Sequence, residues 1–216
     1  MRPEGSRVRL MRARLLGILK RSAEAEADIA YVQQHQPVAA LDWVSRAISK
    51  FDREPEGGLK DLQRAEELFG ANPLILQPMA HVLSERLNRP DESVTVLDRL
   101  LKSKPRYQKA LSGRAVLHAR AGRWELAKRD VDTLLAMPER RGHEINYQIA
   151  CTYALMSPEH PELSQDAISW LARAVAGGYG QDIIDTDTDL QPIRDLQDFQ
   201  MIRRTARILS QQKEQR

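Results

Sequence analysis

Three aspartates at alternate positions, Asp185, Asp187 and Asp189, have the spacing at which a calcium-binding loop presents its first carboxylates. The remainder of that loop is missing, because Leu190 stands where the loop requires glycine and Leu196 where it requires a bidentate glutamate. We therefore expect these aspartates to form a capping turn, and we predict no calcium site.

The histidines and the cysteine do not indicate a zinc site or a catalytic nucleophile. Zinc ligands on one helix occur three or four residues apart, a spacing found nowhere among His35, His81, His118, His143 and His160. The single cysteine, Cys151, has no histidine four residues away, so we interpret it as a small, semi-buried residue rather than a nucleophile. The G-x-G-x-x-G, H-R-D and D-F-G motifs of kinases do not occur. The sequence predicts a protein that is not an enzyme and uses no cofactor and no metal.

The composition indicates which secondary structure the chain forms. The chain has 216 residues, 42% of them apolar and only 5% aromatic, with many Ala and Leu and few β-branched runs. We therefore predict an all-α fold. The longest N-terminal apolar run, "LLGIL", is shorter than the apolar region of a secretory signal, and one cysteine suits a reducing compartment. We expect a cytoplasmic location.

Proline recurs about every 33 residues, at Pro73, Pro105 and Pro138. Each interval contains an amphipathic run, a short turn, and a second amphipathic run that ends near the next proline. Gly122 lies in one such turn, where we expect a left-handed backbone, and Asn88 lies in the preceding one. This pattern is typical of a solenoid built from helix pairs.

The stretch "RAVLHARAGRWELA" resembles the tetratricopeptide repeat, a 34-residue helix-turn-helix unit. Ala115, Gly122 and Ala127 match its small first-helix residue, its turn glycine and the small residue that opens its second helix. The next unit matches through Ala150, Tyr153, Ala167 and Ala174. The resemblance implies a right-handed superhelical solenoid of tetratricopeptide-type helix pairs with a C-terminal capping helix.

We predict three regions. Residues 1–36 form a basic N-terminal helical segment or a degenerate repeat, residues 37–180 hold the repeats, and residues 181–216 form a cap and a polar tail. The repeats are expected at about 38–73, 74–105, 106–138 and 143–180. The cap follows from apolar residues at intervals of three, namely Leu190, Ile193, Leu196, Phe199 and Ile202.

The C-terminal third has a narrower resemblance. Its segments "INYQIACTYALM", "AISWLARAVAGGYG" and "DIIDTDTDLQPIRDLQDFQMIRR" are similar to the end of the tetratricopeptide arrays of planctomycete-type bacterial serine/threonine kinases. Gly177 and Gly178 match a helix C-cap in that pattern, and Phe199 matches a buried aromatic. The resemblance implies a bacterial protein, with a separately encoded serine/threonine kinase as one candidate partner.

The first 21 residues carry seven Lys or Arg and one Glu. Val8, Met11, Leu15 and Ile18 recur there at helical spacing. We expect this apolar stripe to pack on the following helix as an N-terminal cap; the alternative is a basic amphipathic helix that docks on anionic lipid or on an acidic partner. No aromatic residues interleave with the arginines, so we predict no nucleic-acid binding.

The favoured function is a non-catalytic protein–protein interaction module that binds a peptide or a helix of another protein on its concave face. The first helices of successive repeats should line this face with Lys109, Ser112, Val116, Arg120, Glu144, Tyr147 and Cys151. Tyr147 and Arg120 are the expected anchors, since aromatic and arginine side chains dominate interface hot spots. The alternative is a detached regulatory or substrate-docking piece of a bacterial serine/threonine kinase system.

Overall fold

The computed structural model describes residues 5–138 and 140–214. These residues form α-helices and one 3₁₀ helix, without any strand, so the predicted all-α fold is confirmed. The chain divides into two compact units, residues 1–103 and 104–216. None of the helices within the described ranges is long and apolar enough to cross a bilayer.

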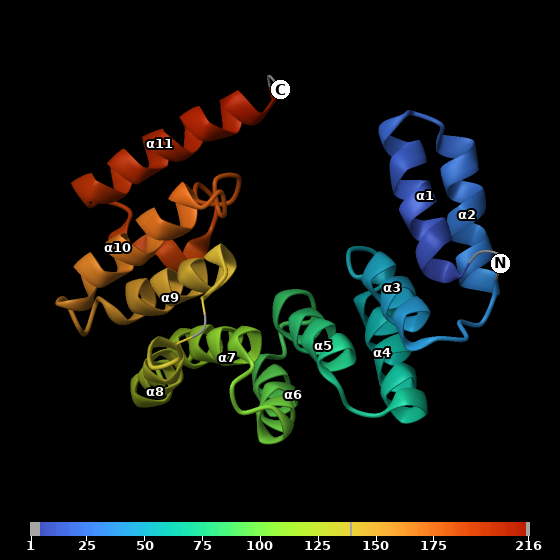
Figure 1. Ribbon diagram of the computed structural model, residues 1–216, viewed down its shortest axis with the longest axis horizontal. Helices are drawn as coiled ribbons and strands as arrows, with labels where there is room; N and C mark the ends of the chain where they lie inside the picture. Colours follow the sequence, from blue (N-terminus) through green and yellow to red (C-terminus); the bar gives the residue numbers. More distant parts are fainter. Residues whose placement is uncertain (1–4, 139, 215–216) are drawn as a thin grey trace. The chain divides into compact units, whose positions relative to one another are not determined.

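The first unit consists of three helical hairpins, drawn from blue to green in Figure 1. Their helices are α1 (Ser6–Ile18) and α2 (Ser22–Gln34), α3 (Ala40–Lys50) and α4 (Pro55–Phe69), and α5 (Pro73–Glu85) and α6 (Pro90–Ser103). Successive first helices pack on one another, α1 on α3 and α3 on α5. This stacking is the arrangement of a solenoid, in which each hairpin needs its neighbour to bury its apolar face.

The second unit consists of two hairpins and a closing segment (Figure 1). Its elements are α7 (Gln108–Arg120) and α8 (Trp124–Leu135), α9 (His143–Met156) and α10 (Leu163–Ala176), the 3₁₀ helix η1 (Thr188–Ile193), and α11 (Gln197–Glu214). The first helices α7 and α9 pack together, η1 packs on α9, and α11 packs on α10.

Local sequence accounts for the helix ends. Pro55, Pro73 and Pro90 are the first residues of α4, α5 and α6, where the missing N–H of proline costs nothing. Pro73 therefore opens a helix, whereas the sequence pattern assigned it to the end of one. Gly122 has φ +66° and Asn88 φ +52°, so the expected left-handed turn is confirmed, with asparagine in the equivalent turn one repeat earlier.

Small residues lie at the helix crossings, as the resemblance implies. Ala115 and Ala127 are fully buried in the α7–α8 hairpin, and Ala150, Ala167 and Ala174 are fully buried in α9–α10. An alanine side chain lets two helix backbones approach more closely than a longer one would. The requirement for small residues in "RAVLHARAGRWELA" is therefore a packing requirement.

The closing segment covers the end of the second unit. Leu190, Ile193 and Phe199 have no exposed surface, and Ile184 is 1% exposed. Leu196 and Ile202, also predicted to cap, are only partly buried. These buried side chains come from the turns after α10, from η1 and from α11, which confirms the predicted C-terminal cap.

The expected packing of the N-terminal apolar stripe is wrong. Val8, Met11, Leu15 and Ile18 are all exposed. Helix α1 instead buries the smaller Ala13 together with Leu16. An apolar pattern of helical period cannot show which of two apolar faces meets the neighbouring helix, and here the face with the alanine does so.

Candidate partner-binding surface

Each of three hairpins is held by an arginine of its first helix and a buried aspartate of its second. Arg46 donates two hydrogen bonds to Asp61, at 2.9 and 2.7 Å, and Arg114 donates two to Asp130, at 2.8 and 2.6 Å. Arg12 binds Asp28 in the same way. Such bidentate pairs fix the rotation of one helix against the other.

Sequence reasoning missed these pairs, although a signal for them exists. The three arginines lie 34 and 68 residues apart, and each aspartate follows its arginine by 15 or 16 residues. The period is that of the tetratricopeptide repeat. A search for charged residues recurring at that period would have found them.

Neighbouring hairpins are joined by contacts 34 or 35 residues apart. Arg86 pairs with Asp52 at 3.2 Å, and Lys109 pairs with Glu144 at 2.7 Å. The Trp124 indole donates to Glu159 at 2.9 Å. Because one repeat separates the partners in each contact, these groups link each hairpin to the next at the surface.

Four of the seven residues predicted for the concave face are buried. Val116 and Ser112 of α7 are 7% and 1% exposed, and the Ser112 hydroxyl donates to Gln148 of α9. Tyr147 and Cys151 of α9 are each 3% exposed. These four side chains therefore support the surface from beneath instead of forming its outer layer.

The other three predicted residues are partly exposed and paired. Lys109 and Glu144 pair with each other, and the hydrogen bond to Glu144 raises the pKa of Lys109. Arg120 donates from Nε and Nη2 to the two oxygens of Asp189, each at 2.9 Å. About a third of the Arg120 side chain remains accessible, whereas that of Asp189 is 7% exposed.

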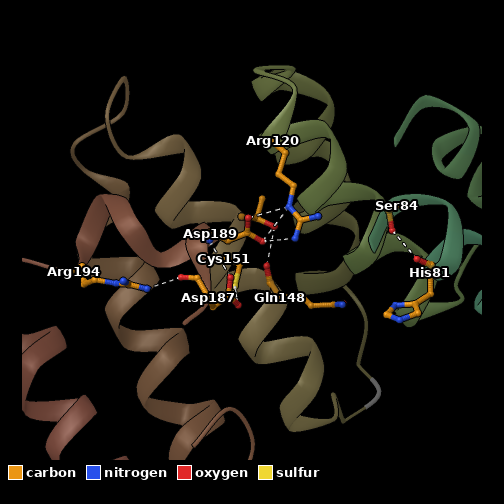
Figure 2. Close-up of polar contacts among 9 residues, drawn as sticks. His81, Ser84, Arg120, Gln148, Cys151, Asp187, Asp189 and Arg194 are labelled. Atoms are coloured by element: carbon orange, nitrogen blue, oxygen red, sulfur yellow. Dashed lines mark hydrogen bonds and ion pairs between the residues drawn. The ribbon is translucent and has the colours of Figure 1, made fainter. Parts of the chain in front are cut away.

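The chain's own aspartate-rich turn covers part of this surface (Figure 2). Asp187 lies with a carboxylate oxygen 3.7 Å from the Cys151 sulfur, while its other oxygen accepts the backbone N–H of Asp189 at 3.0 Å. Arg194 donates to the Asp187 carbonyl at 2.8 Å. Asp187 thus caps η1, which confirms the predicted capping turn.

Tyr147 meets the same segment through its ring. Its ring and that of Tyr179 are arranged edge to face, with centroids 5.5 Å apart. Gly180 has φ +84°, and a Cβ atom built there would lie 2.4 Å from the Tyr147 ring. A glycine is therefore required at this contact for two reasons, its backbone conformation and the lack of space.

Cys151, Asp187 and Asp189 place one candidate ligand atom each within 4.8 Å of one another. Two features of this cluster disfavour a metal ion. Burial raises the pKa of the Cys151 thiol well above its usual value, so a metal ion would have to displace a firmly held proton. Asp189 already has the Arg120 guanidinium as a bidentate partner. The arrangement is therefore better suited to an ion pair than to metal binding.

Comparison with known proteins shows the fold. The chain matches the crystal structure of PilW, described as a widely conserved type IV pilus biogenesis factor, with a TM-score of 0.61 and 20% identity over 91% of this chain and 90% of that one. It matches a tetratricopeptide repeat protein from Parabacteroides merdae ATCC 43184 with a TM-score of 0.59 and 15% identity, over 97% and 88%.

A third solved structure, a MamA RS-1 double mutant, matches with a TM-score of 0.54 and 18% identity, over 82% of this chain and 97% of that one. No protein-family model and no curated protein matches the sequence. At these identities the matches show a solenoid fold of tetratricopeptide type. The kinase system implied by the C-terminal resemblance stays a prediction.

Proposed function

We propose that this protein is a non-catalytic scaffold that binds a segment of another protein on the face formed by α7 and α9. The observation that supports the proposal is that this face already holds a segment of its own chain by side-chain contacts. Arg120 binds the Asp189 carboxylate there, and the Tyr147 ring packs against Tyr179 and Gly180. Arginine and tyrosine are the side chains that most often dominate binding energy at interfaces.

The segment from the end of α10 through η1 is a fixed part of this face. A partner does not have to displace it. Ile184, Leu190 and Ile193 are at least 99% buried, and each contributes about 1.5–3 kcal/mol by burial. A partner of ordinary affinity would not replace three such side chains. We therefore place the partner beside the segment, over Lys109, Glu144 and the accessible part of Arg120.

The surface left open has mixed character. The side chains of Lys109 and Glu144 are 52% and 38% exposed, and the residue Tyr179 is 38% exposed. Two cations, one anion and a tyrosine suit an extended peptide that makes both polar and apolar contacts. A purely acidic tail fits less well, because Glu144 and the aspartate-rich turn would repel it.

Regular spacing supports a repeat array that begins at α1. Three residues of the α1–α2 hairpin each lie three periods of 34 residues before a counterpart in the α7–α8 hairpin. Arg12 precedes Arg114, Lys20 precedes Gly122, and Asp28 precedes Asp130. Lys20 has φ +58°, in the same region as Gly122. We propose that residues 1–36 hold a first repeat, followed by the four repeats predicted above and by the cap.

The first experiment is affinity capture from the source organism followed by mass spectrometry, and the binding face is then tested with the captured partner. We expect Lys109→Ala/Glu144→Ala to weaken its affinity about tenfold or more. Removing both members of this exposed pair leaves no unpaired charge, so the melting temperature should not change.

The matched control is Lys128→Ala/Asp132→Ala, which removes an exposed pair of the same unit on α8, where both side chains are 54% exposed. It should bind the partner like the wild type. Equal affinity of both double variants would refute the α7–α9 face. Recovery of a serine/threonine kinase would favour the alternative role in kinase signalling.

A further inference from the structure

Helix α1 presents an apolar stripe that no described part of the chain covers. Val8, Met11, Leu15, Ile18 and Leu19 are 59%, 57%, 60%, 70% and 65% exposed. At the angular step of an α-helix these five positions fall within an arc about 100° wide. The stripe is therefore one continuous surface along the whole helix, unlike the scattered single residues found on ordinary protein surfaces.

The stripe faces outward because the opposite side of α1 packs on α2. Ala13 and Leu16 are buried against Ala25 and Ile29 of α2. Asp28, with a side chain only 2% exposed, binds both Arg9 and Arg12. Rotating α1 to bury the stripe would break these ion pairs and leave a buried carboxylate without them, which is costly.

The charged side chains that α1 itself places beside the stripe are all basic. Helix α1 contains no acidic residue. Arg7 and Arg14 are exposed along one edge of the stripe, and Arg12, which is exposed but pairs with Asp28, lies along the other. Lys20 is exposed directly after the end of the helix. An apolar stripe between two basic edges is the arrangement of a helix that lies in a membrane interface, with aliphatic side chains among the acyl chains and cations beside the phosphates.

We propose that α1 docks this protein on a membrane surface that contains anionic phospholipid. A second copy of the chain fits the stripe less well, because two copies placed face to face would bring arginine edges together without a carboxylate on either α1. An acidic protein partner also fits less well, since the stripe contains no tryptophan or tyrosine to serve as an anchor.

A hollow beside the stripe is also lined mainly by leucine and arginine. It has a volume of about 450 Å³ and lies where α1 turns into α2, lined by Arg12, Leu15, Leu16, Leu19, Arg21 and Glu24. Leu15 and Leu19 of the stripe form part of its wall, and Leu16 adds to this apolar surface. Glu24 is neutralised by Arg21, which donates to both of its oxygens at 2.6 and 2.7 Å. The hollow therefore adds apolar surface with little negative charge to oppose a phospholipid.

The test is co-sedimentation of the 216-residue chain with vesicles of phosphatidylcholine, with and without phosphatidylglycerol, at low and high salt. We expect binding to be about tenfold tighter or more on the anionic vesicles, and to weaken as salt screens the arginines. Met11→Glu/Leu15→Glu should reduce this binding about tenfold or more, because both changes place a carboxylate in the stripe.

Ile208→Glu is the matched control, since Ile208 is 56% exposed but lies on α11. It should sediment like the wild type, and circular dichroism melts should show that both variants are folded. The proposal is overturned if the protein stays in the supernatant with anionic vesicles at low salt, or if both variants bind equally. It is also overturned if the stripe instead mediates a concentration-dependent dimer or binds only a protein.

Discussion

Replacing Gly180 by alanine should destabilise the second unit much more than the same change at Gly122. Both glycines have a left-handed backbone, with φ +84° and +66°, so each alanine variant has a conformational cost of about 1 kcal/mol. The two sites differ in space. The nearest atom to a Cβ at Gly122 lies 3.7 Å away on Trp124, whereas at Gly180 the Tyr147 ring lies at 2.4 and 2.5 Å.

This difference adds a second cost at Gly180. A Cβ at 2.4 Å from the ring of Tyr147, a residue only 3% exposed, forces the ring or the segment to move, and overpacking of this kind costs about 1–3 kcal/mol. We therefore expect Gly122→Ala to lose about 1 kcal/mol of unfolding free energy and Gly180→Ala about 2–4 kcal/mol.

Urea denaturation in a Trp43→Phe background measures both values. Trp43 is the only tryptophan of the first unit, so the fluorescence of Trp124 and Trp170 then reports the second unit alone. Adding Tyr147→Ala should abolish the extra cost of Gly180→Ala, because the shortened side chain vacates the ring's position. Equal losses for the two glycine variants would show that residues 179–180 do not lie against α9.

The remaining predictions concern the repeat register, the charge pairs and the cap. Ala127→Leu should cost about 1–3 kcal/mol by overpacking a helix crossing, while the exposed Glu125→Gln should cost little; thermal melts that do not separate the two would contradict the register. The hydrogen bond from Arg12 lowers the pKa of Asp28, so this pair stabilises the fold above about pH 4 and loses its effect as the pH falls further. Urea titrations should thus show a gap in stability between wild type and Asp28→Asn that is largest near pH 6 and shrinks toward pH 2; a constant gap would exclude the ion pair as its cause. Ending the chain at Gly180 removes the buried Leu190, Ile193 and Phe199, so light scattering should detect aggregation, and a truncated protein that stays monomeric with an unchanged melt would exclude the capping role.

Local features of the sequence were sufficient to predict the helix pairs. Gly122 and Asn88 determine where a turn can form, because the left-handed backbone favours these residue types within a few positions of a helix end. Ala115 and Ala127 identify crossings, because only small residues allow close approach. The 34-residue period then indicates that successive hairpins repeat one packing arrangement.

The composition of the α7–α9 surface required the tertiary structure. Helical spacing predicted one face that holds Ser112 of α7 with Tyr147 and Cys151 of α9, but it could not show what lies over these residues. The covering segment comes from residues that are distant in sequence, such as Asp189, which is 69 residues from Arg120. A contact of that separation has no local signal, because it depends on how the hairpins stack and where the chain returns.

The direction of α1 was also decided only by tertiary structure. Its sequence alone determined a basic helix with apolar residues on two sides, and the larger side chains of Val8, Met11, Leu15 and Ile18 favoured burial of the wrong side. The buried carboxylate of Asp28 on α2 reverses that preference, because it requires two guanidinium groups of α1 to face it. The stripe is left exposed because it lies on the side of α1 away from the guanidinium groups that bind Asp28.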